Sequence, residues 1–195
     1  MKNYLVQFLS VFLLFNLSIR VAFAFEEEHE AHEHGHATLM LVQEEDELQL
    51  VFKSPAMNIV GFEHQPSSPE QHEKVDWAEK TLSVANRLFL INQQAQCVVE
   101  HVHITSSLLE GSGHSDEHTS QAEDEHESHS DDNKGSHSEF EAEYHFECKN
   151  INALKAIKVT LFDAFGSIEE IEAHIITSSG QQLLELDPSN VSIKF

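Results

Sequence analysis

Basic residues are scarce in this sequence: 11 Lys and Arg stand against 34 Asp and Glu, for a net charge of -23. Lys2 and Arg20 lie in an N-terminal segment that we expect to be removed, which leaves 9 − 34 = -25. Nucleic acid and anionic membrane surfaces repel a surface of that sign, so the charge argues against both as partners. It favours cations, although acidity can also serve solubility alone.

Catalytic signatures are missing as well. The sequence contains no G-x-S-x-G, no P-loop and no catalytic cysteine context, so an enzyme is the least supported class. One nucleus for a hydrolytic zinc site is His101 with His103. A third ligand such as His145 falls, by strand alternation, on the opposite face.

Long apolar runs are confined to one stretch, residues 5–19, which follows Lys2. Ala22-Phe23-Ala24 then forms an A-x-A site, so we expect a signal peptide at residues 1–24, cleaved after Ala24. The alternative, a membrane anchor, requires a longer span. No second run is long enough to cross a membrane, and no cysteine follows the cleavage site to carry a lipid. We therefore expect a soluble exported protein of the bacterial periplasm, without a stable membrane anchor after cleavage.

Cysteine is limited to Cys97 and Cys148. In an oxidising compartment, two cysteines of an exported domain usually pair, and we expect this disulfide. The alternative is a zinc site in which Cys97 joins His101 and His103. The two cysteines are too far apart in sequence for a C-x-x-C knuckle.

Histidine, by contrast, is abundant, with 15 residues. Residues 111–137 have no apolar side chain larger than that of Ala122, so we expect this segment to be disordered when free. Imidazole and carboxylate groups bind borderline divalent metals, and the segment is rich in both. Its candidate ligands are His114, His118, His126, His129 and His137.

A second cluster of histidine and glutamate opens the mature chain at residues 25–36, which we expect to be flexible. His32 and His36 share a face if the segment is helical, and His34 and His36 share one if it is extended. The alternative is a solvated acidic tail. The candidate ligands here are His29, His32, His34 and His36.

The first half of the remaining chain predicts a hairpin followed by a helix. Residues 37–42 and 47–53 alternate apolar and polar side chains around a turn at 44–46, as β-hairpins do. Residues 56–66 suit a packed turn. Ser68, Pro69 and Gln71 then mark a helix start. Apolar residues then recur at 3,4,3,4 spacing, which predicts one apolar face of a helix that continues through Phe89. They are Val75, Ala78, Leu82, Ala85 and Phe89.

Residues 97–104 and 140–148 alternate as two further strands. If Cys97 faces Cys148, opposed residues have numbers that sum to 245, so His101 faces Tyr144 and His103 faces Ala142. His101 and His103 then lie on the cysteine face, where an H-x-H pair can chelate metal. The two strands enclose a long insertion at residues 106–138.

The last third predicts a strand near 157–159, a short helix or turn at 161–165, a hairpin of 168–177 with 182–186, and an edge strand at 191–195. The expected fold is α+β: a mainly antiparallel β-sheet with one well-defined helix and a long, disordered His/Asp/Glu-rich insertion between two strands. We expect a single domain at residues 37–195.

Four segments of the sequence resemble a family of exported bacterial proteins. They are HEHGHA at 32–37, SPAMNIVGFEH at 54–64, FEAEYHFEC at 140–148 and LFDAFGSIEEIEAHIITSSGQ at 161–181. The family is the zinc-regulated periplasmic zinc-binding (ZrgA-like) family, formerly a domain of unknown function. The resemblance implies zinc binding through the insertion in support of zinc acquisition, with a zinc ABC importer or its binding protein as partner.

We expect several Zn²⁺ ions per chain, each held with low to moderate affinity, because ordering the insertion costs free energy. One alternative is a protein that buffers or detoxifies zinc, nickel or copper, and affinity order alone favours Cu(II). The other is a structural or interaction domain whose acidic insertion is merely solvated. That alternative predicts no metal-dependent change in spectra or melting.

Overall fold

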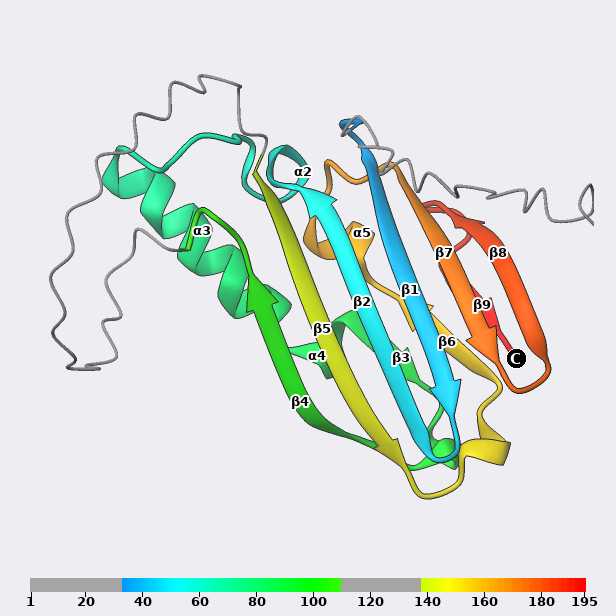
Figure 1. The fold of residues 1–195 in the computed structure, drawn as a ribbon. Coiled ribbons are helices and arrows are strands. Elements are labelled where there is room, and N and C mark those ends of the chain that lie inside the picture. Colours follow the sequence, from blue (N-terminus) through cyan, green and yellow to red (C-terminus); the bar gives the residue numbers. More distant parts are fainter. Residues whose placement is uncertain (1–32, 110–137) are drawn as a thin grey trace, which may run out of the picture. The chain divides into compact units, whose positions relative to one another are not determined.

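The computed structural model describes residues 33–109 and 138–195 (Figure 1). All of them belong to one compact unit that comprises residues 32–195. The expected signal peptide, His29, His32 and the histidines of the insertion lie outside the described residues. In the described parts, no helix is both long enough and apolar enough to cross a membrane.

A six-stranded sheet forms the frame of the domain, with strand order β4-β5-β2-β1-β7-β8 (Figure 1). Its central strands are the predicted hairpin, β1 (His36–Glu44) and β2 (Glu47–Pro55). β5 (Glu139–Cys148) pairs with β2, and β4 (Cys97–Thr105) pairs with β5, both antiparallel. On the other side, β7 (Glu170–Thr177) runs parallel to β1, and β8 (Gly180–Leu186) closes a hairpin with β7.

Strand alternation explains why these segments form a sheet with one buried face. Leu39 and Leu41 of β1 and Leu48, Leu50 and Phe52 of β2 are fully buried, whereas the residues between them are exposed or half-buried. Such period-two burial is typical of a sheet that packs on one side only.

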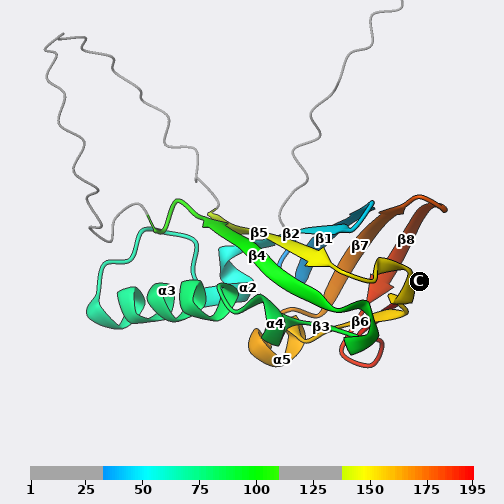
Figure 2. The same cartoon turned by 90° about the horizontal axis from the view of Figure 1, so that it is seen from below.

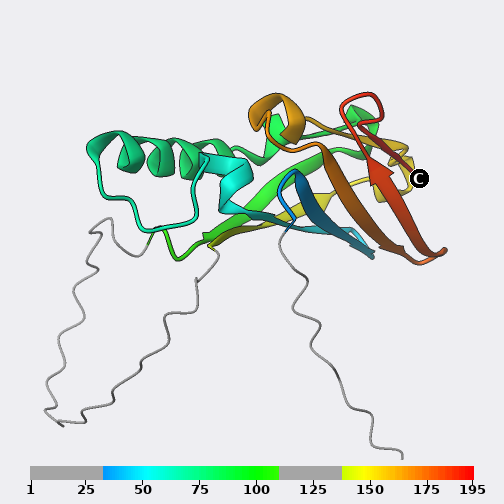
Figure 3. The ribbon, with the colours of Figure 1, turned by 90° about the horizontal axis from the view of Figure 1, so that it is seen from above.

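The other elements cover that buried face. A second sheet, of order β3-β6-β9, is built from β3 (Phe89–Ile91), β6 (Ala156–Val159) and β9 (Ser192–Lys194). Figures 2 and 3 show this small sheet and the helices on the same side of the large sheet. The short elements on that side are α2 (Ala56–Val60), α4 (Ala85–Leu88), α5 (Leu161–Ala164), and the 3-10 turns η1 (Gln93–Ala95) and η2 (Ile151–Ala153). No helix or strand of the described residues covers the opposite face of the large sheet, which we call the open face.

The long helix α3 (Pro69–Leu82) begins where the sequence predicts. Ser68 accepts a hydrogen bond from the backbone N–H of Gln71, and Pro69 occupies the first turn. The helix ends at Leu82, so the prediction that it continues through Phe89 was wrong. Ser83 and Val84 separate it from α4, although every residue of the predicted apolar stripe is buried.

The expected α+β architecture is confirmed. Two features of it differ from the prediction. The pairing of β7 with β1 is parallel, and it places the final hairpin beside the first strand of the domain. The predicted last strand pairs with β6 in a separate small sheet. Both differences arise from long-range pairings, which local alternation does not encode.

Candidate metal centre

The disulfide and the insertion lie at opposite ends of the β4–β5 pair. Cys97 and Cys148 are opposed in register and bonded to each other, with their Cα atoms 3.8 Å apart. The predicted disulfide is therefore present, and the alternative, a zinc site built on Cys97, is wrong because its sulfur is already bonded. At the other end of the pair, β4 and β5 lead to the two ends of residues 110–137, which we now call the insertion.

The folded domain holds both ends of the insertion. Residues 106–109 were predicted to belong to the loop, but Leu108 is fully buried and Leu109 packs against the core. Ser107 Oγ donates to Ser138 Oγ at 3.0 Å. Ser138 Oγ donates to the carbonyl oxygen of Glu63 at 2.8 Å, and the Gln65 side chain donates to the carbonyl oxygen of Ser107 at 2.7 Å. The segment after α2 therefore clamps the two ends together.

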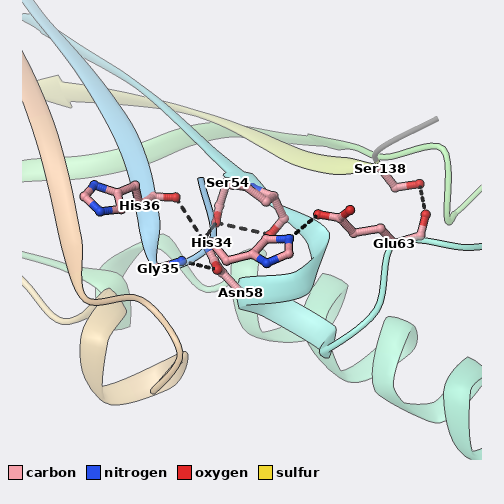
Figure 4. A network of polar contacts seen from close by, with 8 residues as sticks. His34, Gly35, His36, Ser54, Asn58, Glu63 and Ser138 are labelled. Atoms are coloured by element: carbon pink, nitrogen blue, oxygen red, sulfur yellow. Dashed lines mark hydrogen bonds and ion pairs between the residues drawn. The ribbon is translucent and has the colours of Figure 1, made fainter. Parts of the chain in front are cut away.

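The same segment reaches the histidine-rich N-terminal residues (Figure 4). His34 Nε2 lies 3.3 Å from Glu63 Oε1. The buried Asn58 accepts a hydrogen bond from the N–H of Gly35 at 2.8 Å and donates to the carbonyl oxygen of His36 at 2.9 Å. Glu63 thus contacts His34 through its side chain and Ser138 through its backbone.

His34 and His36 do not share a face. His34 and Gly35 form a turn in which Gly35 has φ +90°, and β1 begins only at His36. The extended geometry that would align the two rings is absent, and Figure 4 shows them pointing apart. His36 Nδ1 instead lies 3.5 Å from a carboxylate oxygen of Glu170 on β7. Each of these two histidines therefore has its own carboxylate.

His101 and His103 lie on the open face, and the predicted register fails before it reaches them. Val99 is still opposite Phe146, but His101 is opposite His145 and His103 is opposite Glu143. The shift lies between Val99 and His101. Beyond this bulge, Val102 and Ile104 pack against the core, and both histidines are exposed.

His145 consequently shares a face with His101 and His103. The prediction that His145 lies on the opposite face was wrong, as were the pairings of His101 with Tyr144 and His103 with Ala142. The His101 ring centroid lies 6.3 Å from that of His103 and 6.1 Å from that of His145. The bulge is a one-residue insertion in the pairing, which reverses the faces of all later residues.

Of the predicted ligands, the structure places His34, His36, His101 and His103, and all four reach solvent. It brings His101 and His103 together and keeps them apart from the N-terminal pair. Within residues 33–109 and 138–195, no three His, Cys, Asp or Glu side chains already surround a common point. The remaining predicted ligands lie outside these ranges: His29, His32, His114, His118, His126, His129 and His137.

The accessible imidazole and carboxylate groups of the described residues suit the binding of a borderline divalent cation. A family model described as "ZrgA family zinc uptake protein" matches residues 31–195. The chain belongs to this family. A search among curated proteins found no similar sequence.

The family assignment gives the protein a part in zinc uptake and makes a metal ion its partner. It covers the domain, the insertion and the end of the N-terminal cluster, since the match begins at Ala31. It also agrees with the resemblance found in the sequence.

Proposed function

We propose that this protein is an exported, periplasmic zinc-binding protein that captures Zn²⁺ through its histidine-rich insertion and passes it to a zinc importer. Its signal peptide is cleaved after Ala24, and the mature chain acts as a non-catalytic accessory of transport. The ligands are the histidines of the insertion, with those of residues 25–36 as a second group. Each chain binds several ions.

One observation carries this proposal: the folded domain anchors the ends of both histidine-rich segments to residues 63–65. Glu63 contacts His34 at 3.3 Å, and its carbonyl oxygen accepts from Ser138 at 2.8 Å. Gln65 donates to the backbone of Ser107 at the other end of the insertion. A structural domain with a merely solvated acidic loop would not need contacts from residues 63–65 to His34, Ser107 and Ser138.

The chemistry of the insertion suits capture followed by release. Only the neutral imidazole binds metal, and an ordinary histidine titrates near about pH 6.5, so capture weakens steeply below about pH 6. Neighbouring carboxylates can ligate zinc or accept a hydrogen bond from the other ring nitrogen of a ligating histidine. Ordering a segment on binding costs free energy, so each ion is held less tightly than in a preformed site.

The test is a zinc titration of the full mature chain, by calorimetry at neutral pH, with and without the imidazoles of the insertion. The variant changes five residues to Asn: His114, His118, His126, His129 and His137. The matched control changes five serines of the same insertion to Asn: Ser112, Ser115, Ser120, Ser128 and Ser130.

We expect the histidine variant to bind fewer ions than the wild type and the serine control to bind the same number. Equal stoichiometry in all three proteins would refute capture by the insertion. In zinc-limited cells that lack the protein, the wild type should restore zinc uptake and the histidine variant should not. Uptake that is restored equally by both would refute the role of the captured zinc in transport.

A further inference from the structure

The bulge in β4 changes the sheet face on which the side chains of His101 and His103 lie. Glu100 lies between Val99, which faces Phe146, and His101, which faces His145, and it has no residue opposite it. Without this extra residue, strand alternation would turn His101 and His103 toward the core. With it, Val102 and Ile104 pack inside and the two imidazoles emerge on the open face. Bulges are found where a strand must redirect a side chain, often beside functional sites.

We propose that His101, His103 and His145 form a zinc site on the open face, with the Glu143 carboxylate as the fourth ligand. This inference rests on the proposed zinc-binding function and adds a site on the folded domain. Its ligands come from two adjacent strands: His101 is opposite His145, and His103 is opposite Glu143. Four potential ligands therefore occupy the corners of one small patch of sheet.

The spacing of the rings is close to what zinc requires. Two imidazoles bound to one tetrahedral zinc at about 2.0–2.1 Å have ring centroids roughly 5 Å apart. The His101 ring is 6.3 Å from the His103 ring and 6.1 Å from the His145 ring, so His101 is the central ligand. Side-chain rotation can close the remaining gap of about 1 Å, because the strand register already places these residues at neighbouring positions of the sheet.

The rings are free to rotate. The His101 and His103 planes lie nearly parallel, at 12°, as side chains stacked side by side on a strand rather than turned toward a bound group. Both are exposed and His145 is half-buried. Within the described residues, no hydrogen bond or ion pair engages the nitrogens of these three rings. Binding a metal therefore breaks no existing polar contact there.

The surrounding charge favours a cation. The open face of β5 carries only acidic residues besides His145: Glu139, Glu141, Glu143 and Glu147. The nearest basic group on β2, Lys53, is bound to Glu141 at 2.7 Å, and this hydrogen bond raises the pKa of the Lys53 ammonium. Lys53 also attracts Glu143 electrostatically, but its ion pair is with Glu141. The acidic side chains of β5 outnumber this one ammonium, so the patch attracts divalent cations.

The position of the patch suits a relay. His103 lies two residues before the end of β4 at Thr105, where the chain turns toward the insertion. A site on rigid strands, whose side chains only need to rotate, loses less entropy on binding than a segment whose backbone must order around the metal. The sheet site therefore binds zinc more tightly than a site within the insertion and can collect an ion captured there.

The experiment uses the full mature chain and counts bound zinc in competition with a chelator. The test variant is His101→Ala/His103→Ala/His145→Ala. The matched control removes three histidines elsewhere on the domain: His64, His72 and His174, each changed to Ala. A third protein carries the five His→Asn changes in the insertion. Melting temperatures of the metal-free proteins establish that each variant is folded.

We expect the sheet variant to lose one ion per chain, the tightest one, and the control to lose none. The insertion variant should retain that ion while losing others. If the sheet variant binds as many ions as the wild type, with the same tightest affinity, the sheet site is refuted and capture by the insertion is untouched. If the insertion variant loses nothing while the sheet variant loses its ion, the proposed function fails and the sheet site stands.

Discussion

The orientation of β5 can be tested through its tyrosine. The sequence contains only Tyr4 and Tyr144, so cleavage after Ala24 leaves Tyr144 as the single tyrosine. Its ring is fully buried against Phe89, with ring centroids 5.0 Å apart. Its hydroxyl donates to the carbonyl oxygen of Leu82, at the end of α3, at 3.0 Å. Burial raises the pKa of the Tyr144 phenol well above its ordinary value.

The sign of the pH effect follows from this shift. Because the folded pKa is raised, the contribution of Tyr144 to stability is complete below the unfolded value of about 10 and is lost as the pH rises above it. Above about pH 10, the wild type should lose up to about 1.4 kcal/mol of stability per pH unit more than Tyr144→Phe loses. Near neutral pH the variant should be less stable by about 1 kcal/mol, the net value of the lost hydrogen bond.

Tyrosinate absorbance, recorded with circular dichroism during an alkaline titration, measures this directly. We expect no tyrosinate near pH 10 while the protein stays folded, and a rise only as the structure is lost. Ordinary titration near pH 10 in the intact fold would refute the burial of Tyr144. It would also undermine the sheet site, because His145 reaches the open face only if its neighbour Tyr144 points inward.

Two further predictions concern the disulfide of the β4–β5 pair and the contacts at the start of β1. Cys97→Ser/Cys148→Ser removes a crosslink between residues 51 apart. The lost loop-closure entropy should lower the free energy of unfolding by about 4 kcal/mol in urea, and an unchanged midpoint would contradict this. Asn58→Ala removes hydrogen bonds to Gly35, His36 and Ser54 in a buried setting, so we expect a loss of about 2–4 kcal/mol. Ser54→Ala, which removes only one of these bonds, should cost less, and equal losses would show that Asn58 does not pin the start of β1.

Local patterns were sufficient to predict much of the sheet. The alternation around Leu39 and Leu50 predicts the first hairpin, since period-two burial is a local property of a strand. Ser68 and Pro69 predict the start of α3 for a similar reason, because capping involves only adjacent residues. The pairing of Cys97 with Cys148 was predictable from their number and from the expected compartment.

The bulge at Glu100 was not predictable from those patterns. Counting from the disulfide gives the correct register up to Val99 and the wrong one from His101 onward. The mixed pattern of residues 97–104 carries a signal, because strict alternation places the charged Glu100 on one strand face with the apolar Val98, Val102 and Ile104. A charged residue at an expected core position is a reason to test a shifted register.

The anchoring of the histidine-rich segments was beyond sequence reasoning as well. Asn58 lies in an apolar stretch and gives no sign that its amide binds the backbone of Gly35 and His36. The contacts of Glu63 with His34 and Ser138 join residues 29 and 75 positions apart in sequence. Such contacts depend on tertiary packing, which neither spacing nor composition specifies.

Under the proposed function, the clamp at Glu63 and Ser138 also determines how the two histidine-rich segments act on a shared ion. Binding groups tethered to nearby points meet at an effective concentration set by tether length, which reaches the millimolar range for short flexible tethers. A zinc ion held by one segment then encounters the other segment intramolecularly, whatever the concentration of the protein. Avidity of this kind would let individually weak ligands retain zinc in dilute solution. Release would still be fast, because the ion can leave its ligands one at a time.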